Sequence, residues 1–191
     1  MSLQDGLAAL NLDMPPYVPR TEYSVTEHWE LVRAVTGMQV NRQSSDEIKL
    51  AAGQAFMKAW NFDLLWCTLI GGSEFKDLRT RMGHCVYADG GGDFDTVRSC
   101  PFSQPEQVLA FDPWEAFGSI NHAATTKRFE KQYEGLCRKY PDMVNMTGVY
   151  ITCVSGLIDL FGWEMLLLAA GTDAKAFGDL TNRYSNWILQ Y

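Results

Sequence analysis

The sequence predicts an α/β protein that is an incomplete part of a larger barrel or doubly wound domain. Amphipathic helices alternate with strands that are apolar on both faces, the pattern of right-handed βα units around a parallel sheet. Only about three strands can be recognised, which is few for a finished sheet accompanied by so many helices. We therefore expect residues 1–191 to form a single partial domain.

The last predicted helix carries an aromatic stripe, since apolar residues recur at spacings of three and four near the end of the sequence. The stripe contains Phe177, Leu180, Tyr184, Trp187 and Tyr191. Such a stripe needs a surface to pack against. We expect that surface from a second copy of the chain or from a separately encoded C-terminal half.

Composition excludes several classes of protein. Hydrophobic residues make up 47% of the chain and the formal net charge is −7, which favours a folded domain and argues against a nucleic-acid partner. Five scattered cysteines without CxxC spacing, and no signal peptide, favour a cytoplasmic protein. The apolar run 157–170 contains two acids and is shorter than the ~20 residues of a membrane span, so we expect a buried helix and no membrane partner.

The first third of the chain begins with a segment that cannot be helical. Three prolines in residues 13–20 remove backbone donors, and a short strand is predicted over residues 17–23. Ser24-x-x-Glu27 has the form of a capping box and precedes a helix that Gly37 closes. Ser44-x-x-Glu47 repeats this signature before a helix that extends to about Trp60.

The remaining elements follow from hydrophobic patterning. Residues 63–70 read as a strand buried on both faces, ended by Gly71-Gly72. Residues 73–105 are irregular and glycine-rich, and a loop of this length is more often functional than idle. A helix over 121–140, a strand over 146–154 and two helices separated by residues 171–173 complete the prediction.

Several segments of this chain resemble the N-terminal half of the uroporphyrinogen decarboxylase superfamily, which includes cobalamin- and coenzyme M-dependent methyltransferases. The likeness is carried by Leu7-Ala8-Ala9-Leu10, Tyr17-Val18-Pro19-Arg20, Trp60-Asn61-Phe62-Asp63, Thr80-Arg81-Met82-Gly83-His84, residues 147–152, Phe177-Gly178 and Asn182-Arg183-Tyr184. It implies the N-terminal portion of a (β/α)8 TIM-type barrel, with the active site at the carboxyl ends of the strands.

The sequence departs from the decarboxylases at two family positions. Their arginine-rich motif is replaced by residues 22–27, which contain no arginine, and their strand-end aspartate falls near Ile70 or Gly71. The resemblance therefore implies a protein that acts, when complete, on a tetrapyrrole or, in the favoured methyltransferase-like branch, on a methylated small molecule with a corrinoid partner. The alternative is a non-catalytic or assembly-dependent module that needs a second chain. In either case we expect this chain alone to be inactive.

The resemblance requires no cofactor from this half of the family's domain. The methyltransferases bind zinc through ligands in their C-terminal half, so zinc is expected only there. His84-Cys85 is not a convincing substitute, because adjacent residues point in different directions and a zinc site needs three or four convergent ligands. We predict no metal site in this chain.

Three groups of residues are candidates for chemistry. Glu22 and Tyr23 lie at the predicted mouth of the first strand, where barrel enzymes place catalytic side chains; the alternative is a solvent-facing acid beside a packed tyrosine. Asp159 interrupts an apolar helix and is a third catalytic candidate, unless it faces solvent. The glycine-rich loop supplies candidates for substrate binding, with a solvated lid of mutually paired charges as the alternative: Arg79, Arg81, His84 and Asp93.

Overall fold

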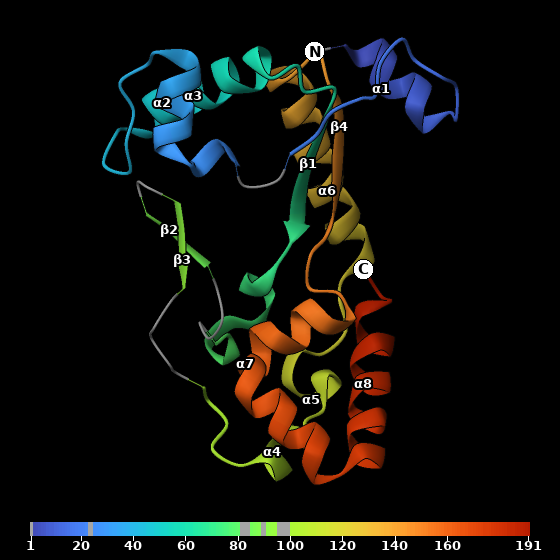
Figure 1. The fold of residues 1–191 in the computed structure, drawn as a ribbon. Coiled ribbons are helices and arrows are strands. Elements are labelled where there is room, and N and C mark those ends of the chain that lie inside the picture. The colour runs from blue at the N-terminus through green and yellow to red at the C-terminus, as the bar shows by residue number, and fades with distance from the viewer. Residues whose placement is uncertain (1, 23–24, 81–84, 89–90, 95–99) are drawn as a thin grey trace. The chain divides into compact units, whose positions relative to one another are not determined.

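The structure is a computed structural model, and it describes residues 2–22, 25–80, 85–88, 91–94 and 100–191 (Figure 1). The chain divides into two compact units. Unit 1 comprises Met1–Cys67, Cys85–Asp93 and Lys131–Thr147, and unit 2 comprises Thr68–His84, Phe94–Glu130 and Gly148–Tyr191. Each unit has its own hydrophobic core.

Unit 1 is built mainly from the helices of the first third of the chain. These are α1 (Leu3–Leu10), the 3-10 turn η1 (Val25–Glu27), α2 (Trp29–Thr36) and α3 (Asp46–Ala59). The apolar faces of α2 and α3 form the core together with residues from the neighbouring loops. The buried residues of this core are Trp29, Val32, Val40, Ala52, Phe56, Met57, Phe62 and Met143.

Asp63 anchors the N-terminal segment to the rest of unit 1. Its side chain is fully buried and accepts hydrogen bonds from the backbone N–H groups of Ser2 (2.7 Å) and Arg20 (3.1 Å) and from the Tyr17 hydroxyl (3.3 Å). A buried carboxylate is tolerated when such donors replace its lost hydration. Asp63 thus has a structural task at the start of the first strand.

Unit 2 contains the remaining helices, with a turn that precedes them. The turn is η2 (Gly72–Leu78), and the two short helices are α4 (Pro105–Leu109) and α5 (Pro113–Phe117). The long helices α7 (Cys153–Thr172) and α8 (Ala174–Ile188) pack against each other (Figure 1). Helix α6 (His122–Lys139) begins in unit 2 and ends in unit 1.

Helix α7 is broken at Gly162, which has φ 70° and ψ 161°. Glycine adopts this conformation without the steric cost that a Cβ would bring. The break interrupts the regular i to i+4 hydrogen bonding, and groups outside the helix take its place. Thr80 N–H donates to the backbone carbonyl of Asp159 (2.7 Å), and the Cys100 thiol donates to that of Phe161 (3.3 Å).

The aromatic stripe of α8 is buried within unit 2 itself. Leu180, Tyr184 and Trp187 are at most 1% exposed, and the Trp187 ring lies 5.2 Å from that of Phe117. Residues of α5, α7 and η2 supply the covering surface that this stripe needs. Self-association or a C-terminal-half partner stays a prediction, and the stripe no longer motivates it.

Close approach of α7 to α8 depends on Gly156. The Tyr184 hydroxyl donates a 2.7 Å hydrogen bond to the Ile151 carbonyl, directly over this glycine. A Cβ at position 156 would overlap the hydroxyl and lie 2.6 Å from Tyr184 Cζ. Only glycine leaves enough space for the buried tyrosine.

The described residues contain two separate two-stranded sheets. β1 (Leu64–Ile70) pairs with β4 (Val144–Val149), and β2 (Cys85–Ala88) pairs with β3 (Gly91–Phe94). β1 and β4 are parallel, because Asp63 O accepts from Val144 N and Ile70 O accepts from Tyr150 N. Elsewhere the described structure is mainly helical.

The predicted TIM-type barrel is therefore wrong for the described structure, which contains a two-stranded parallel sheet and no barrel. The strand predicted over residues 17–23 is reduced to a single parallel bridge between Arg20 and Phe62. The prolines explain this, because Pro19 has no N–H to donate and a ladder cannot extend through it. Two residues predicted to belong to the first barrel strand, Tyr17 and Arg20, instead donate hydrogen bonds to the Asp63 side chain.

The helices predicted after the two capping signatures are present, but both begin at a later residue than predicted. Helix α2 begins after His28, whose Nδ1 accepts from Leu31 N–H (3.3 Å), and Gly37 ends it with φ 71° as predicted. Helix α3 begins after Ser45 rather than Ser44. Both serines precede an acidic turn, so the sequence motif alone does not distinguish them.

The apolar run is longer and less buried than predicted. It belongs to the 20-residue helix α7, which by length and composition alone could cross a membrane. Among the described residues this is the single candidate span, and 44% of it is buried inside the protein. Its inward face belongs to the core of unit 2, which is the usual explanation for such a helix in a folded protein.

We predict that Gly156→Ala lowers the free energy of unfolding by about 1–3 kcal/mol, because the new methyl group must displace Tyr184. Gly178→Ala is the matched control, since a Cβ there meets open space in α8 and should be neutral or stabilising. Urea denaturation measures both. Equal midpoints for the two variants would contradict the close approach described above.

Candidate functional site

The candidate site lies where the two parallel strands end. β1 ends at Ile70 and is followed by Gly71 and Gly72, while β4 ends at Val149. Tyr150 N–H donates to the Ile70 carbonyl (2.8 Å), so the two carboxyl ends are adjacent. In parallel sheets, ligands bind at this edge of the strands.

Arg79 and Asp159 meet beside this edge, although they are distant in sequence. Arg79 Nε lies 3.7 Å from Asp159 Oδ2. The aspartate side chain is 3% exposed, whereas the arginine side chain is 47% exposed. The pair therefore has a buried acidic end and an accessible basic end.

Burial of the Asp159 carboxylate requires a compensating charge. An isolated ion in a low-dielectric interior loses its hydration at a cost of several kcal/mol. The Arg79 guanidinium provides the opposite charge, and the Thr80 N–H fixes the Asp159 backbone next to it. The prediction that Asp159 would need a partner if it faced inward agrees with this arrangement.

Gly72 makes room for the pair. A Cβ at this position would overlap Asp159 Oδ2 and lie 2.5 Å from Arg79 Nε. The Gly71-Gly72 pair was interpreted from sequence only as the end of a buried strand. Its second function, the close approach of two charged side chains to the backbone, was missed because that function depends on α7.

Tyr184 is the other titratable group beside Asp159. Burial raises the pKa of its hydroxyl far above the usual value of 10.0, and the nearby Asp159 charge raises it further. The hydroxyl therefore stays protonated and donates to the Ile151 carbonyl. Tyr184 was predicted only as part of an apolar stripe, so this polar contact was not anticipated.

The other predicted site residues do not join this pair in the described structure. Glu22 is exposed and belongs to unit 1. Tyr23, Arg81 and His84 lie outside the described residues, as does the side chain of Asp93 in β3. Of the seven predicted residues, the structure thus brings together Arg79 and Asp159.

The chemistry that this pair can support is anion binding. The Asp159 carboxylate orients the guanidinium, whose remaining N–H donors match a carboxylate or phosphate. Within the described part of the chain, no group of three His, Cys, Asp or Glu side chains is placed to hold a metal ion. The Arg79 guanidinium is a cationic hydrogen-bond donor at this edge.

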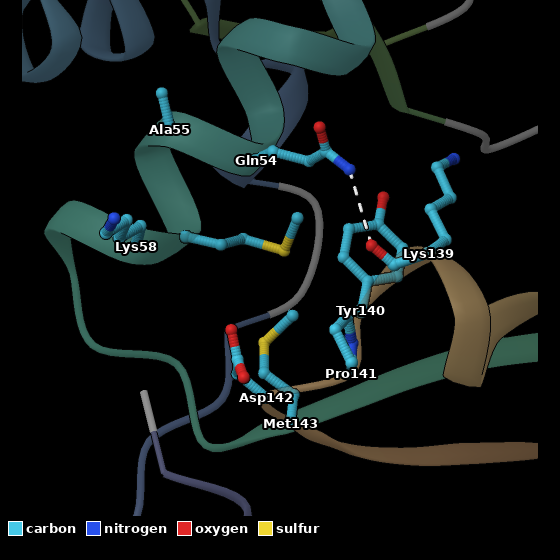
Figure 2. Close-up of a pocket in the computed structure, with 9 residues that line it drawn as sticks. Gln54, Ala55, Lys58, Lys139, Tyr140, Pro141, Asp142 and Met143 are labelled. Atoms are coloured by element: carbon cyan, nitrogen blue, oxygen red, sulfur yellow. Dashed lines mark hydrogen bonds between the residues drawn. The ribbon is translucent and has the colours of Figure 1, made fainter.

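A separate cavity of about 240 Å3 lies in unit 1 between α3 and the loop after α6 (Figure 2). Lys58 and Lys139 come from opposite walls, and Gln54 Nε2 donates to the Lys139 carbonyl (3.5 Å). The rest of the lining is largely apolar and includes Met57 and Met143. Because Met143 directly precedes β4, this cavity lies at the amino end of that strand, where parallel sheets do not usually bind ligands.

Comparisons with known proteins returned nothing: no family model matches the sequence, and neither curated proteins nor solved structures gave a match. The resemblance to the uroporphyrinogen decarboxylase superfamily therefore depends on the sequence segments alone. The site must be interpreted from its own geometry.

The raised tyrosine pKa values predict that the protein becomes less stable above about pH 10. Burial also raises the pKa of Tyr191, to about 12. Above pH 10 the unfolded tyrosines lose protons that the folded ones keep, so stability falls with pH, by at most about 1.4 kcal/mol per pH unit for the buried Tyr184 and by less for the partly solvated Tyr191. Urea midpoints from about pH 8 to about pH 11 measure this loss.

Tyr184→Phe should make the loss of stability with pH less steep, because phenylalanine has no proton to lose, and the contribution of Tyr191 should remain. Tyr150→Phe is the control, since Tyr150 is 43% exposed. A dependence in Tyr184→Phe as steep as in the wild type would contradict the assignment.

Proposed function

We propose that this chain supplies an anion-binding site to an enzyme that acts on a carboxylate-bearing small molecule. The observation that carries the proposal is the meeting of Arg79 and Asp159 at the carboxyl ends of β1 and β4. Arg79 binds the substrate carboxylate through its exposed guanidinium. Asp159 is a positioning residue, because its buried side chain contacts a ligand only through Arg79.

The reaction class follows from the sequence resemblance. We propose the methyltransferase-like branch, in which a methylated small molecule reacts with a corrinoid partner protein, and keep decarboxylation of a tetrapyrrole as the alternative. Both substrate classes can carry carboxylates, which is the group that an arginine fork recognises best. The four described cysteines are free thiols, which supports a reducing cytoplasmic location.

Two probes test the site and distinguish the branches. Glycine betaine represents a methylated carboxylate, and uroporphyrin represents a polycarboxylate tetrapyrrole. Isothermal titration of the wild-type chain should show saturable binding of one of them. Arg79→Gln should weaken that binding about tenfold, the effect of losing a charge-assisted contact.

Two further variants keep the result interpretable. Arg79→Lys retains the charge without the planar fork, so it should fold and bind with intermediate affinity. Arg138→Gln removes an equivalent charge from a residue that is 72% exposed, and should bind like the wild type. Failure of both probes, or equal binding by Arg79→Gln and Arg138→Gln in folded protein, would contradict the proposal.

A further inference from the structure

Besides the cavity in unit 1, the protein has a cavity of about 300 Å3 in unit 2. Neither the sequence prediction nor the proposed function assigns it a role. It lies between η2, the start of α6 and the end of the chain. Aromatic rings line one side, from Phe117, Trp187 and Tyr191. Charged side chains line another, from Glu74, Lys76 and Arg128.

The charged side chains that line this cavity are two cations and one anion. Glu74 Oε1 accepts from Arg128 Nη2 (2.8 Å), and Glu74 Oε2 accepts from the Tyr191 hydroxyl (3.4 Å). Both carboxylate oxygens are therefore occupied, and Lys76 adds a second cation to the same lining. Arg128 keeps further N–H donors, because a guanidinium has five. The two cationic side chains and the spare N–H donors of Arg128 favour an anion.

Lys76 has an unusual backbone conformation, with φ 51° and ψ −129°. This region strains residues that carry a Cβ and is normally occupied by glycine. Strain of this kind concentrates at functional sites, where a particular side chain is needed in spite of its cost. The strained backbone is thus a second feature, besides its place in the lining, that distinguishes Lys76 from the other lysines near the cavity.

The aromatic side of the cavity is held rigidly. Trp187 Nε1 donates to the Gly118 carbonyl (2.9 Å), which fixes the indole, and its ring lies 5.6 Å from that of Tyr191. Ile120 on the same lining donates its N–H to Gln190 Oε1 (2.8 Å). The Gln190 amide nitrogen is buried without an acceptor among the described residues, which leaves a spare donor beside this wall.

We propose that this cavity binds an aromatic carboxylate, with the carboxylate held by Lys76 and Arg128 and the ring packed against the partly exposed rings of Phe117 and Tyr191. The rings offer a flat apolar surface of the kind that aromatic groups prefer. Lys76 and Arg128 bind the carboxylate of the ligand. The Glu74 carboxylate is paired with Arg128, which balances its charge, and this pairing orients the guanidinium. Neither Arg79 nor Asp159 lines this site, although the Arg79 N–H donates to the Lys76 carbonyl (3.3 Å).

The test uses 1-naphthoate as the probe and 1-naphthalenemethanol as its neutral counterpart. Isothermal titration of the wild-type chain should show one saturable naphthoate site, with the alcohol binding at least about tenfold more weakly. Lys76→Gly should also weaken naphthoate binding about tenfold while raising the urea midpoint, because glycine relieves the strained backbone. A merely structural lysine would not produce these opposite changes.

Lys127→Gln is the matched control, since it removes one exposed positive charge from α6 next to Arg128 without lining the cavity. It should leave naphthoate binding unchanged. The proposal is overturned if no saturable binding occurs, if the alcohol binds as tightly as naphthoate, or if Lys76→Gly and Lys127→Gln bind equally.

Discussion

The break in α7 at Gly162 is the constraint on which the organisation of unit 2 depends. It interrupts the helix just after Asp159 and exposes backbone carbonyls that other segments must satisfy. Thr80 and Cys100 provide those contacts, so the segment after η2 and the segment before α4 are both tied to the same turn of α7. The buried Asp159 carboxylate adds a charged contact to Arg79 at this point. One irregular position thus brings together the residues of the candidate site.

Local periodicity allowed the individual helices and strands to be predicted. The strand over residues 63–70 and the helices now called α6 and α8 agree closely with the prediction, because their patterns reflect burial on two faces or on one face. Global topology was not accessible in this way. The proline-rich segment has the composition of an extended chain, but whether it extends a sheet or anchors Asp63 is decided by hydrogen bonds to distant residues.

The aromatic stripe illustrates the same limit. The three- and four-residue spacing of apolar residues in α8 indicates that Tyr184 and Trp187 must be covered. The spacing does not indicate whether the covering surface belongs to the same chain. Here η2 and α5 supply it, through Phe75 and Phe117. The covering surface could not be foreseen, because Phe75 lies in residues 73–105, which were interpreted as an irregular loop, and no helix was predicted over the residues of α5.

The candidate site could be predicted only in part. Arg79 and Asp159 were selected by residue type, one as a cation near a strand end and one as an acid in an apolar helix. Their pairing depends on the break in α7 and on Gly72, neither of which leaves a local signal strong enough to predict. Lys76 was not among the predicted site residues. It is distinguished by its positive φ, and the residue type lysine gives no indication of such a conformation.

A double-mutant cycle on Arg79 and Asp159 tests the central claim most directly. The unfolding free energies of the wild type, Arg79→Gln, Asp159→Asn and the double variant give the coupling energy between the two side chains. A buried carboxylate compensated by this arginine predicts that Arg79→Gln destabilises strongly, and that adding Asp159→Asn recovers about 1 kcal/mol or more. Effects of the two substitutions that simply add would show that Arg79 does not hold Asp159, and would contradict the account.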